Sequence, residues 1–116
     1  MCDSQTGYCL DLDVYTGKQA RPSAKGFGFD VVTQLMAQHL HKGHHVYFDR
    51  FFTGVELVEF LKRNETNACG TIMLNRKNLP QEAKTLKLKK GESAFFIKND
   101  TGIYVNFTCA NYVVQE

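Results

Sequence analysis

The spacing of hydrophobic residues changes along the chain and predicts strands and helices in alternation. The first segment lies between residues 8 and 14, where apolar side chains occupy every second position: Tyr8, Leu10, Leu12 and Val14. A period of two is typical of a β-strand with one buried face. Residues 4–7 precede it and have the composition of a turn. The pattern therefore predicts a β-hairpin at the start of the chain, with Met1 to Asp3 as its first arm.

Two later segments have the spacing of amphipathic helices. The first covers residues 29–40, with Asp30 near its start and Lys42-Gly43 at its end. The second is VELVEFLKR, residues 55–63, which Thr53 or Gly54 can cap. Its buried side is expected to hold four residues: Leu57, Val58, Phe60 and Leu61.

Short apolar segments between and after these helices predict further strands. They are residues 45–48, residues 67–74, and two or three antiparallel strands within residues 93–116, with a turn at 99–102. A helical crossover after an opening hairpin indicates a mixed sheet with helices on its faces. We expect the first strand and the strand 45–48 to be parallel neighbours. The fold class is therefore α/β.

Composition is that of one ordinary globular domain. The chain has 116 residues, 43% hydrophobic and 22% charged, which argues against general disorder. The net charge of +2 is unevenly distributed along the chain. Residues 50–98 are basic, with ten Lys/Arg and five Asp/Glu. This distribution suits either a solvated face or contact with a polyanion. The four cysteines lack zinc-site spacing, no signal peptide precedes them, and no apolar run approaches a membrane span. We expect a reduced, intracellular protein without a membrane segment.

Two aspartates, Asp3 and Asp49, each follow the apolar part of a predicted strand. If the two strands are parallel neighbours, both carboxylates lie at one edge of the sheet. Carboxylate oxygens suit Mg²⁺, and paired metal ions can support phosphoryl transfer. Spacing alone nevertheless favours a turn or capping role for each aspartate, because a metal site of this kind usually needs a third carboxylate.

Several linked motifs change that weighting. CDSQTGYCLDLDVYTGK, KGHHVYFDRFFTG, the helix with LKR, and ACGTIMLNRKNLP occur in this order between residues 2 and 80. Together they resemble the piggyBac family of DNA transposases and their host-domesticated derivatives. The chain departs from the family at Arg50, where Asn is usual, at Gly54, where Ser is usual, and in the sequence after Gly91.

The resemblance implies a fold, a site and a partner. It implies a truncated RNase H-like mixed sheet with flanking helices in residues 1–75 and part of a β-rich insertion in residues 76–116. It implies that Asp3 and Asp49 are catalytic ligands of Mg²⁺ or Mn²⁺ and that DNA is the partner. The family's third aspartate has no match here, so we expect no transposition by this chain alone. A nuclear location and a homodimer of the full-length protein are further implications.

Basic residues near the motifs are candidate phosphate contacts, although a solubilising loop explains the lysine-rich stretch equally well. The candidates are Arg50, Arg76, Lys77, Lys87, Lys89 and Lys90. Three origins remain open: part of an active transposase, a domesticated module that binds DNA or another partner without catalysis, and a non-functional relic. The four histidines, residues 39, 41, 44 and 45, are interpreted as structural or surface residues.

Overall fold

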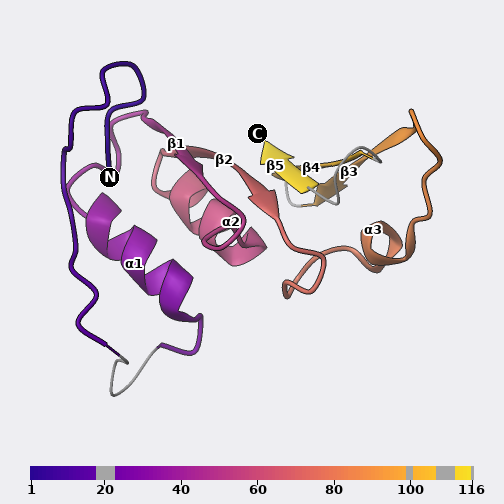
Figure 1. Ribbon diagram of the computed structural model, residues 1–116, viewed down its shortest axis with the longest axis horizontal. Helices are drawn as coiled ribbons and strands as arrows, with labels where there is room; N and C mark the ends of the chain where they lie inside the picture. The colour runs from indigo at the N-terminus through magenta and orange to yellow at the C-terminus, as the bar shows by residue number, and fades with distance from the viewer. Residues whose placement is uncertain (18–22, 99–100, 107–111, 116) are drawn as a thin grey trace. The chain divides into compact units, whose positions relative to one another are not determined.

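A computed structural model describes residues 1–17, 23–98, 101–106 and 112–115 (Figure 1). The chain forms two compact units, Met1–His39 and Leu40–Glu116. The first contains helix α1 (Phe27–Met36), and the second contains two further helices and a five-stranded sheet. Among the described residues, no helix combines the length and apolar character needed to cross a membrane.

The start of the first unit is a turn rather than the predicted two-stranded hairpin. One antiparallel bridge, between Cys2 and Cys9, closes it, and residues 10–16 form no strand. The alternating apolar side chains stay exposed, from 50% at Leu10 to 70% at Tyr8. The prediction of a strand here was wrong, because alternation yields a strand only when a neighbour pairs with its backbone and covers its apolar face. Residues 1–3 contribute only the Cys2 bridge, and the expected parallel pairing of a first strand with residues 45–48 stays a prediction.

Helix α1 is shorter than predicted. It begins two residues earlier, at Phe27, and ends at Met36 rather than near residue 40. The Asp30 carboxylate accepts hydrogen bonds from the Ser23 amide, at 3.0 Å, and from the Ser23 hydroxyl, which ties the incoming chain to the first turn. Residues 37–41 continue as turns, and His41 adopts a positive φ of 60° that ends any helical course.

The second unit is built on a mixed sheet, as the sequence predicted. Its strands are β1 (His45–Phe48), β2 (Asn67–Ile72), β3 (Ser93–Lys98), β4 (Thr101–Asn106) and β5 (Tyr112–Gln115). Their spatial order is β1-β2-β5-β4-β3 (Figure 1). Among the described strands, only the β1–β2 pair is parallel, and the other three pairs are antiparallel. Of the turn predicted at 99–102, residues 99–100 lie outside the described residues and residues 101–102 begin β4.

Helix α2 (Val55–Arg63) makes the crossover between the two parallel strands and packs on β2. Its bounds match the predicted segment. Buried residues recur at helical spacing and form half of the buried hydrophobic residues described in this unit: Val55, Leu57, Val58 and Leu61, each at most 2% exposed. Phe60, also expected in this core, is only half-buried.

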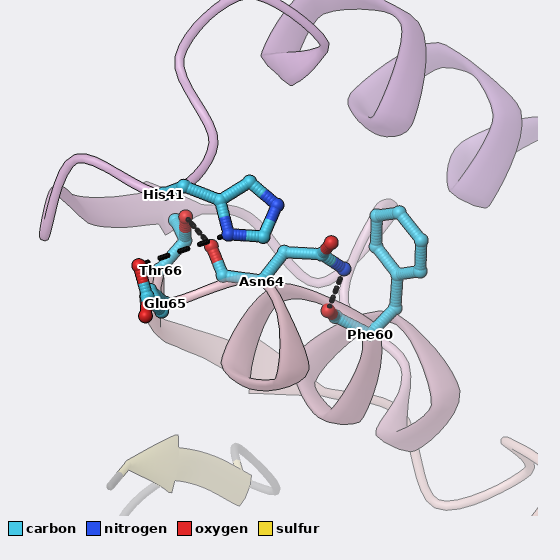
Figure 2. A network of polar contacts seen from close by, with 5 residues as sticks. All are labelled: His41, Phe60, Asn64, Glu65 and Thr66. Atoms are coloured by element: carbon cyan, nitrogen blue, oxygen red, sulfur yellow. Dashed lines mark hydrogen bonds and ion pairs between the residues drawn. The ribbon is translucent and has the colours of Figure 1, made fainter.

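A polar network fixes the passage from α2 into β2 (Figure 2). The Asn64 side-chain amide donates to the Phe60 carbonyl at 2.7 Å, and the Thr66 hydroxyl donates to the Asn64 carbonyl at 3.0 Å. His41 approaches from the segment before β1: its amide donates to the Asn64 carbonyl, and its Nδ1 lies 3.7 Å from the Glu65 carboxylate. These contacts hold the starts of β1 and β2 side by side, as their parallel register requires.

The lysine-rich segment contains a short helix that the sequence did not predict, α3 (Gln81–Thr85). Ala83 and the preceding Leu79 are buried, so this segment is anchored by two apolar side chains while its lysines stay exposed. Strands β3 to β5 follow and join the same sheet as β1 and β2 through the β2–β5 pair. The proposed domain boundary at residue 75 stays a prediction.

Candidate metal-binding aspartates and their supporting turns

Asp49 is the first residue after β1 and begins the turn that leads to α2. Its Oδ1 accepts a hydrogen bond from the Phe51 amide at 2.9 Å, and its backbone carbonyl accepts from the amides of Phe52 and Thr53. Within the described part of the chain, Oδ2 accepts no hydrogen bond. The side chain is exposed, and the bond to Oδ1 fixes its orientation.

Thr53 ties this turn to the sheet. It is fully buried, and its hydroxyl donates to the Asp49 carbonyl at 2.7 Å. The predicted choice between Thr53 and Gly54 as helix cap is thereby resolved, because Gly54 is the N-cap and makes no side-chain cap bond. Opposite lies Gly70, where an added Cβ would come within 2.5 Å of the Thr53 hydroxyl and 2.6 Å of the Phe48 carbonyl. The end of β1, the Asp49 turn and β2 thus meet where only glycine fits.

Arg76 reaches the same turn from the loop after β2. Its Nη2 donates to the Arg50 carbonyl at 3.2 Å and to the Phe51 carbonyl. The sequence suggested Arg76 as a contact to DNA phosphate. The structure instead gives its guanidinium two backbone acceptors in the turn that Asp49 begins. Its role toward DNA stays a prediction.

Asp3 lies in the first unit and has a similar local construction. Its Oδ1 accepts hydrogen bonds from the Thr6 hydroxyl at 2.7 Å, the Thr6 amide at 2.8 Å and the Gln5 amide at 3.1 Å. These bonds favour the ionised form, and the hydroxyl and amide of Thr6 lower the pKa of Asp3 below its ordinary value of 3.8. Asp3 is therefore a carboxylate at neutral pH, which is the form that binds metal.

Asp3 and Asp49 belong to different compact units, and each begins a separate turn of the backbone. Among the described residues, no group of three or more His, Cys, Asp or Glu side chains is placed to hold a metal ion. The donor chemistry at each position does fit a hard cation, because each turn fixes one carboxylate oxygen through Oδ1 and makes no bond to Oδ2. A site shared by the two aspartates stays a prediction.

The remaining basic candidates are exposed. They are Arg50 in the Asp49 turn and four lysines in and after the NRK segment: Lys77, Lys87, Lys89 and Lys90. Exposure leaves their charged groups accessible to a polyanion. It is equally consistent with a role in binding DNA phosphates and with a role in keeping the protein soluble. Their contact with DNA stays a prediction.

Two comparisons bear on the family. A family model described as "Transposase IS4" matches residues 1–114. The chain belongs to this transposase family. Among solved structures, a piggyBac transposase seen by cryo-EM in a synaptic complex with hairpin DNA matches 98% of this chain at 20% identity and a TM-score of 0.84. The piggyBac-like resemblance read from the motifs is thus confirmed. The chain spans about a quarter of the length of that transposase, at 25%.

The sequence of this transposase-family chain did not show how three residues support the Asp49 turn. Thr53 follows Asp49 by four positions, which suits a hydroxyl-to-carbonyl bond across one turn, yet the same spacing suits a helix cap. Gly70 stands in the CGT motif without a turn signal. Arg76 lies 25 and 26 residues from the carbonyls that it contacts. A local pattern carries no signal for a contact of that separation.

Proposed function

We propose that this chain forms part of the catalytic region of a piggyBac-like DNA transposase, with DNA as its substrate. Family membership over residues 1–114 supports the reaction class. The structural likeness to a piggyBac transposase, whose described complex contains hairpin DNA, supports DNA as the partner. The chain covers a quarter of that protein, so the activity belongs to an assembly in which this chain supplies a portion.

The observation that carries the proposal is the similar construction of Asp3 and Asp49. Each begins a turn, each has Oδ1 held by a backbone amide two residues on, and each leaves Oδ2 without a bond from the described residues. Such a carboxylate is oriented in advance and keeps one oxygen for a cation. We infer that both aspartates hold Mg²⁺ or Mn²⁺. A bound cation of this kind stabilises negative charge on a phosphate during transfer.

The finer architecture belongs to the same proposal. The β1–α2–β2 unit is the part of an RNase H-like core that carries the second aspartate, and residues 76–116 belong to a β-rich insertion. A third carboxylate then comes from outside this chain. The likeness of fold to a piggyBac transposase supports the architectural part of this proposal. That the full-length protein acts in the nucleus as a homodimer is proposed from the resemblance of the motifs alone.

Arg50 and the exposed lysines supply the sequence-independent part of DNA binding in this proposal. Lys77 is exposed in the loop after β2, and Lys87, Lys89 and Lys90 are exposed between α3 and β3. Lysine side chains neutralise phosphates and release counterions, so binding weakens as salt rises. Arg50 directly follows Asp49, which places one cationic side chain next to the proposed metal ligand.

Fluorescence anisotropy of a labelled hairpin DNA tests the proposal. We expect the chain to bind the DNA at low salt and to bind more tightly with Mg²⁺ than with EDTA. The double variant Asp3→Asn/Asp49→Asn should lose the gain from Mg²⁺, while the exposed control Asp13→Asn keeps it. Binding that ignores Mg²⁺ and both aspartates would instead identify a non-catalytic DNA-binding module. Absence of binding at low salt would contradict DNA as the partner.

A further inference from the structure

The loop after β2 contains a half-buried arginine whose guanidinium contacts the protein backbone. Arg76 donates through Nη2 to two consecutive carbonyls, those of Arg50 and Phe51, while the adjacent Lys77 is exposed. The Arg76 Nε is buried and has no acceptor among the described residues. Burial of an unsatisfied N–H carries a free-energy cost. The two carbonyl bonds through Nη2 hold the guanidinium at this turn.

The two carbonyls lie in the turn that orients Asp49. The Phe51 amide donates to Asp49 Oδ1 at 2.9 Å, and the Phe51 carbonyl accepts from Arg76. Both peptide groups that flank Phe51 are therefore restrained. In the first, Asp49 accepts from the Phe51 amide and Arg76 donates to the Arg50 carbonyl; in the second, Arg76 donates to the Phe51 carbonyl. Loss of the arginine frees the Arg50–Phe51 segment, and with it the amide that holds the aspartate.

We propose that Arg76 is a positioning residue, which fixes the Asp49 carboxylate for cation binding by holding the backbone of the Arg50–Phe51 turn. This inference rests on the proposed function in that Asp49 is taken as a metal ligand. Arg76 itself touches neither the carboxylate nor the proposed cation. It acts through the peptide groups between Asp49 and Thr53.

The sign of the effect separates positioning from simple charge. Arg76 is a cation close to a proposed cation site. Removal of its charge alone would strengthen Mn²⁺ binding, because like charges repel. Removal of a positioning contact would weaken Mn²⁺ binding, because the carboxylate loses its orientation. The two explanations therefore predict opposite changes in affinity.

The test uses the 116-residue chain and the variants Arg76→Met, Arg76→Lys and the control Lys77→Met. Met keeps an aliphatic stem and removes every donor. Lys keeps the charge and can donate to two carbonyls, but its side chain is one bond shorter. Two readouts are measured by NMR: the exchange rate of the Phe51 amide with water, and the Mn²⁺ concentration that broadens the Phe51 amide signal.

Arg76→Met should accelerate exchange at Phe51 by about tenfold and weaken Mn²⁺ binding by a similar factor, as expected for loss of two hydrogen bonds. The Val58 amide, which donates to the Gly54 carbonyl at 3.1 Å, serves as the internal reference and should not change. Arg76→Lys should fall between Arg76→Met and the unmodified chain. Lys77→Met should leave exchange unchanged and Mn²⁺ binding equal or tighter.

The following outcomes decide the matter. Equal exchange at Phe51 in Arg76→Met and Lys77→Met would overturn the inference, as would tighter Mn²⁺ binding by Arg76→Met. If the unmodified chain binds no Mn²⁺ near Phe51, the proposed function fails at Asp49, and the exchange rates still test whether Arg76 holds the turn. If Arg76→Met does not fold, Arg76→Lys provides the comparison with a smaller expected effect. Exchange of the Phe51 amide in Arg76→Lys at the rate of the unmodified chain would then overturn the inference.

Discussion

A Cβ atom at Gly70 would lie 2.5 Å from the hydroxyl oxygen of Thr53, far closer than two nonbonded atoms approach. Gly70 belongs to β2, opposite Phe48 in the parallel pair, and Thr53 closes the turn that Asp49 begins. The relationship connects the sheet to the candidate metal ligand. Whatever occupies position 70 sets how closely the Asp49 turn lies against β2.

The first prediction concerns Gly70→Ala. The added methyl group meets the Thr53 hydroxyl and the Phe48 carbonyl, neither of which is the far end of a flexible side chain. We expect the free energy of unfolding in urea to fall by about 1–3 kcal/mol, the usual cost of overpacking. Gly54→Ala is the control, because a Cβ there meets nothing within 4 Å. Equal losses for the two variants would contradict the close approach.

The second prediction concerns Thr53→Val. Valine retains the shape of threonine and removes the buried hydroxyl that donates to the Asp49 carbonyl at 2.7 Å. We expect a loss of about 1 kcal/mol in the free energy of unfolding, together with altered NMR shifts at Asp49 and Phe51. Thr53→Ser keeps the hydroxyl and should keep those shifts. If Thr53→Val leaves the shifts of the turn unchanged, the hydroxyl does not position it.

The third prediction concerns pH. Hydrogen bonds from Thr6 lower the pKa of Asp3 in the folded chain below 3.8, so the folded turn binds the proton less readily than the unfolded chain. The turn is therefore stabilised above that pH, and the stabilisation disappears as the pH falls below 3.8 and through the folded pKa. An NMR titration of the Asp3 carboxyl carbon measures this pKa directly.

Thr6→Val is the matched variant for that titration. It removes the hydrogen bond from the hydroxyl to Asp3 Oδ1, which is the largest cause of the lowered pKa. The hydrogen bond from the backbone amide of residue 6 to the same oxygen remains. The pKa of Asp3 should rise toward 3.8 but stay below it. An unchanged pKa in the variant would show that the hydroxyl does not bond to the carboxylate.

Much of the second unit was predictable because its patterns are local. Residues 45–48, 55–63 and 67–74 carry the spacing of their elements, and tertiary packing agrees with it, except that β2 ends at Ile72 rather than at residue 74. The segment 8–14 has an equally regular pattern, yet it forms no strand. Strand formation depends on a pairing partner, which is information that the segment does not contain. Helix α3 was missed because its five residues bury only Ala83, too little for a periodic signal.

The candidate site shows the same division. Asp3 and Asp49 were selected as candidates because they follow apolar segments within recognisable motifs, and the structure shows that each turn holds its carboxylate by a bond to Oδ1. The support from Arg76 depends on a contact between residues 25 positions apart, which no local pattern encodes. Sequence therefore indicated the acidic residues, and structure was needed for the groups that orient Asp49.

The central claim is that Asp3 and Asp49 are each ligands of a divalent cation, and Mn²⁺ broadening in two-dimensional NMR spectra tests it most directly. In the unmodified chain, Mn²⁺ should broaden the amide signals of Thr6, which donates to Asp3, and of Phe51, which donates to Asp49. Asp3→Asn should abolish broadening at Thr6 and Asp49→Asn should abolish broadening at Phe51, while Asp13→Asn leaves both intact. If Mn²⁺ broadens neither amide, or if broadening persists at each amide after its aspartate is replaced, the aspartates are not cation ligands and the account is contradicted.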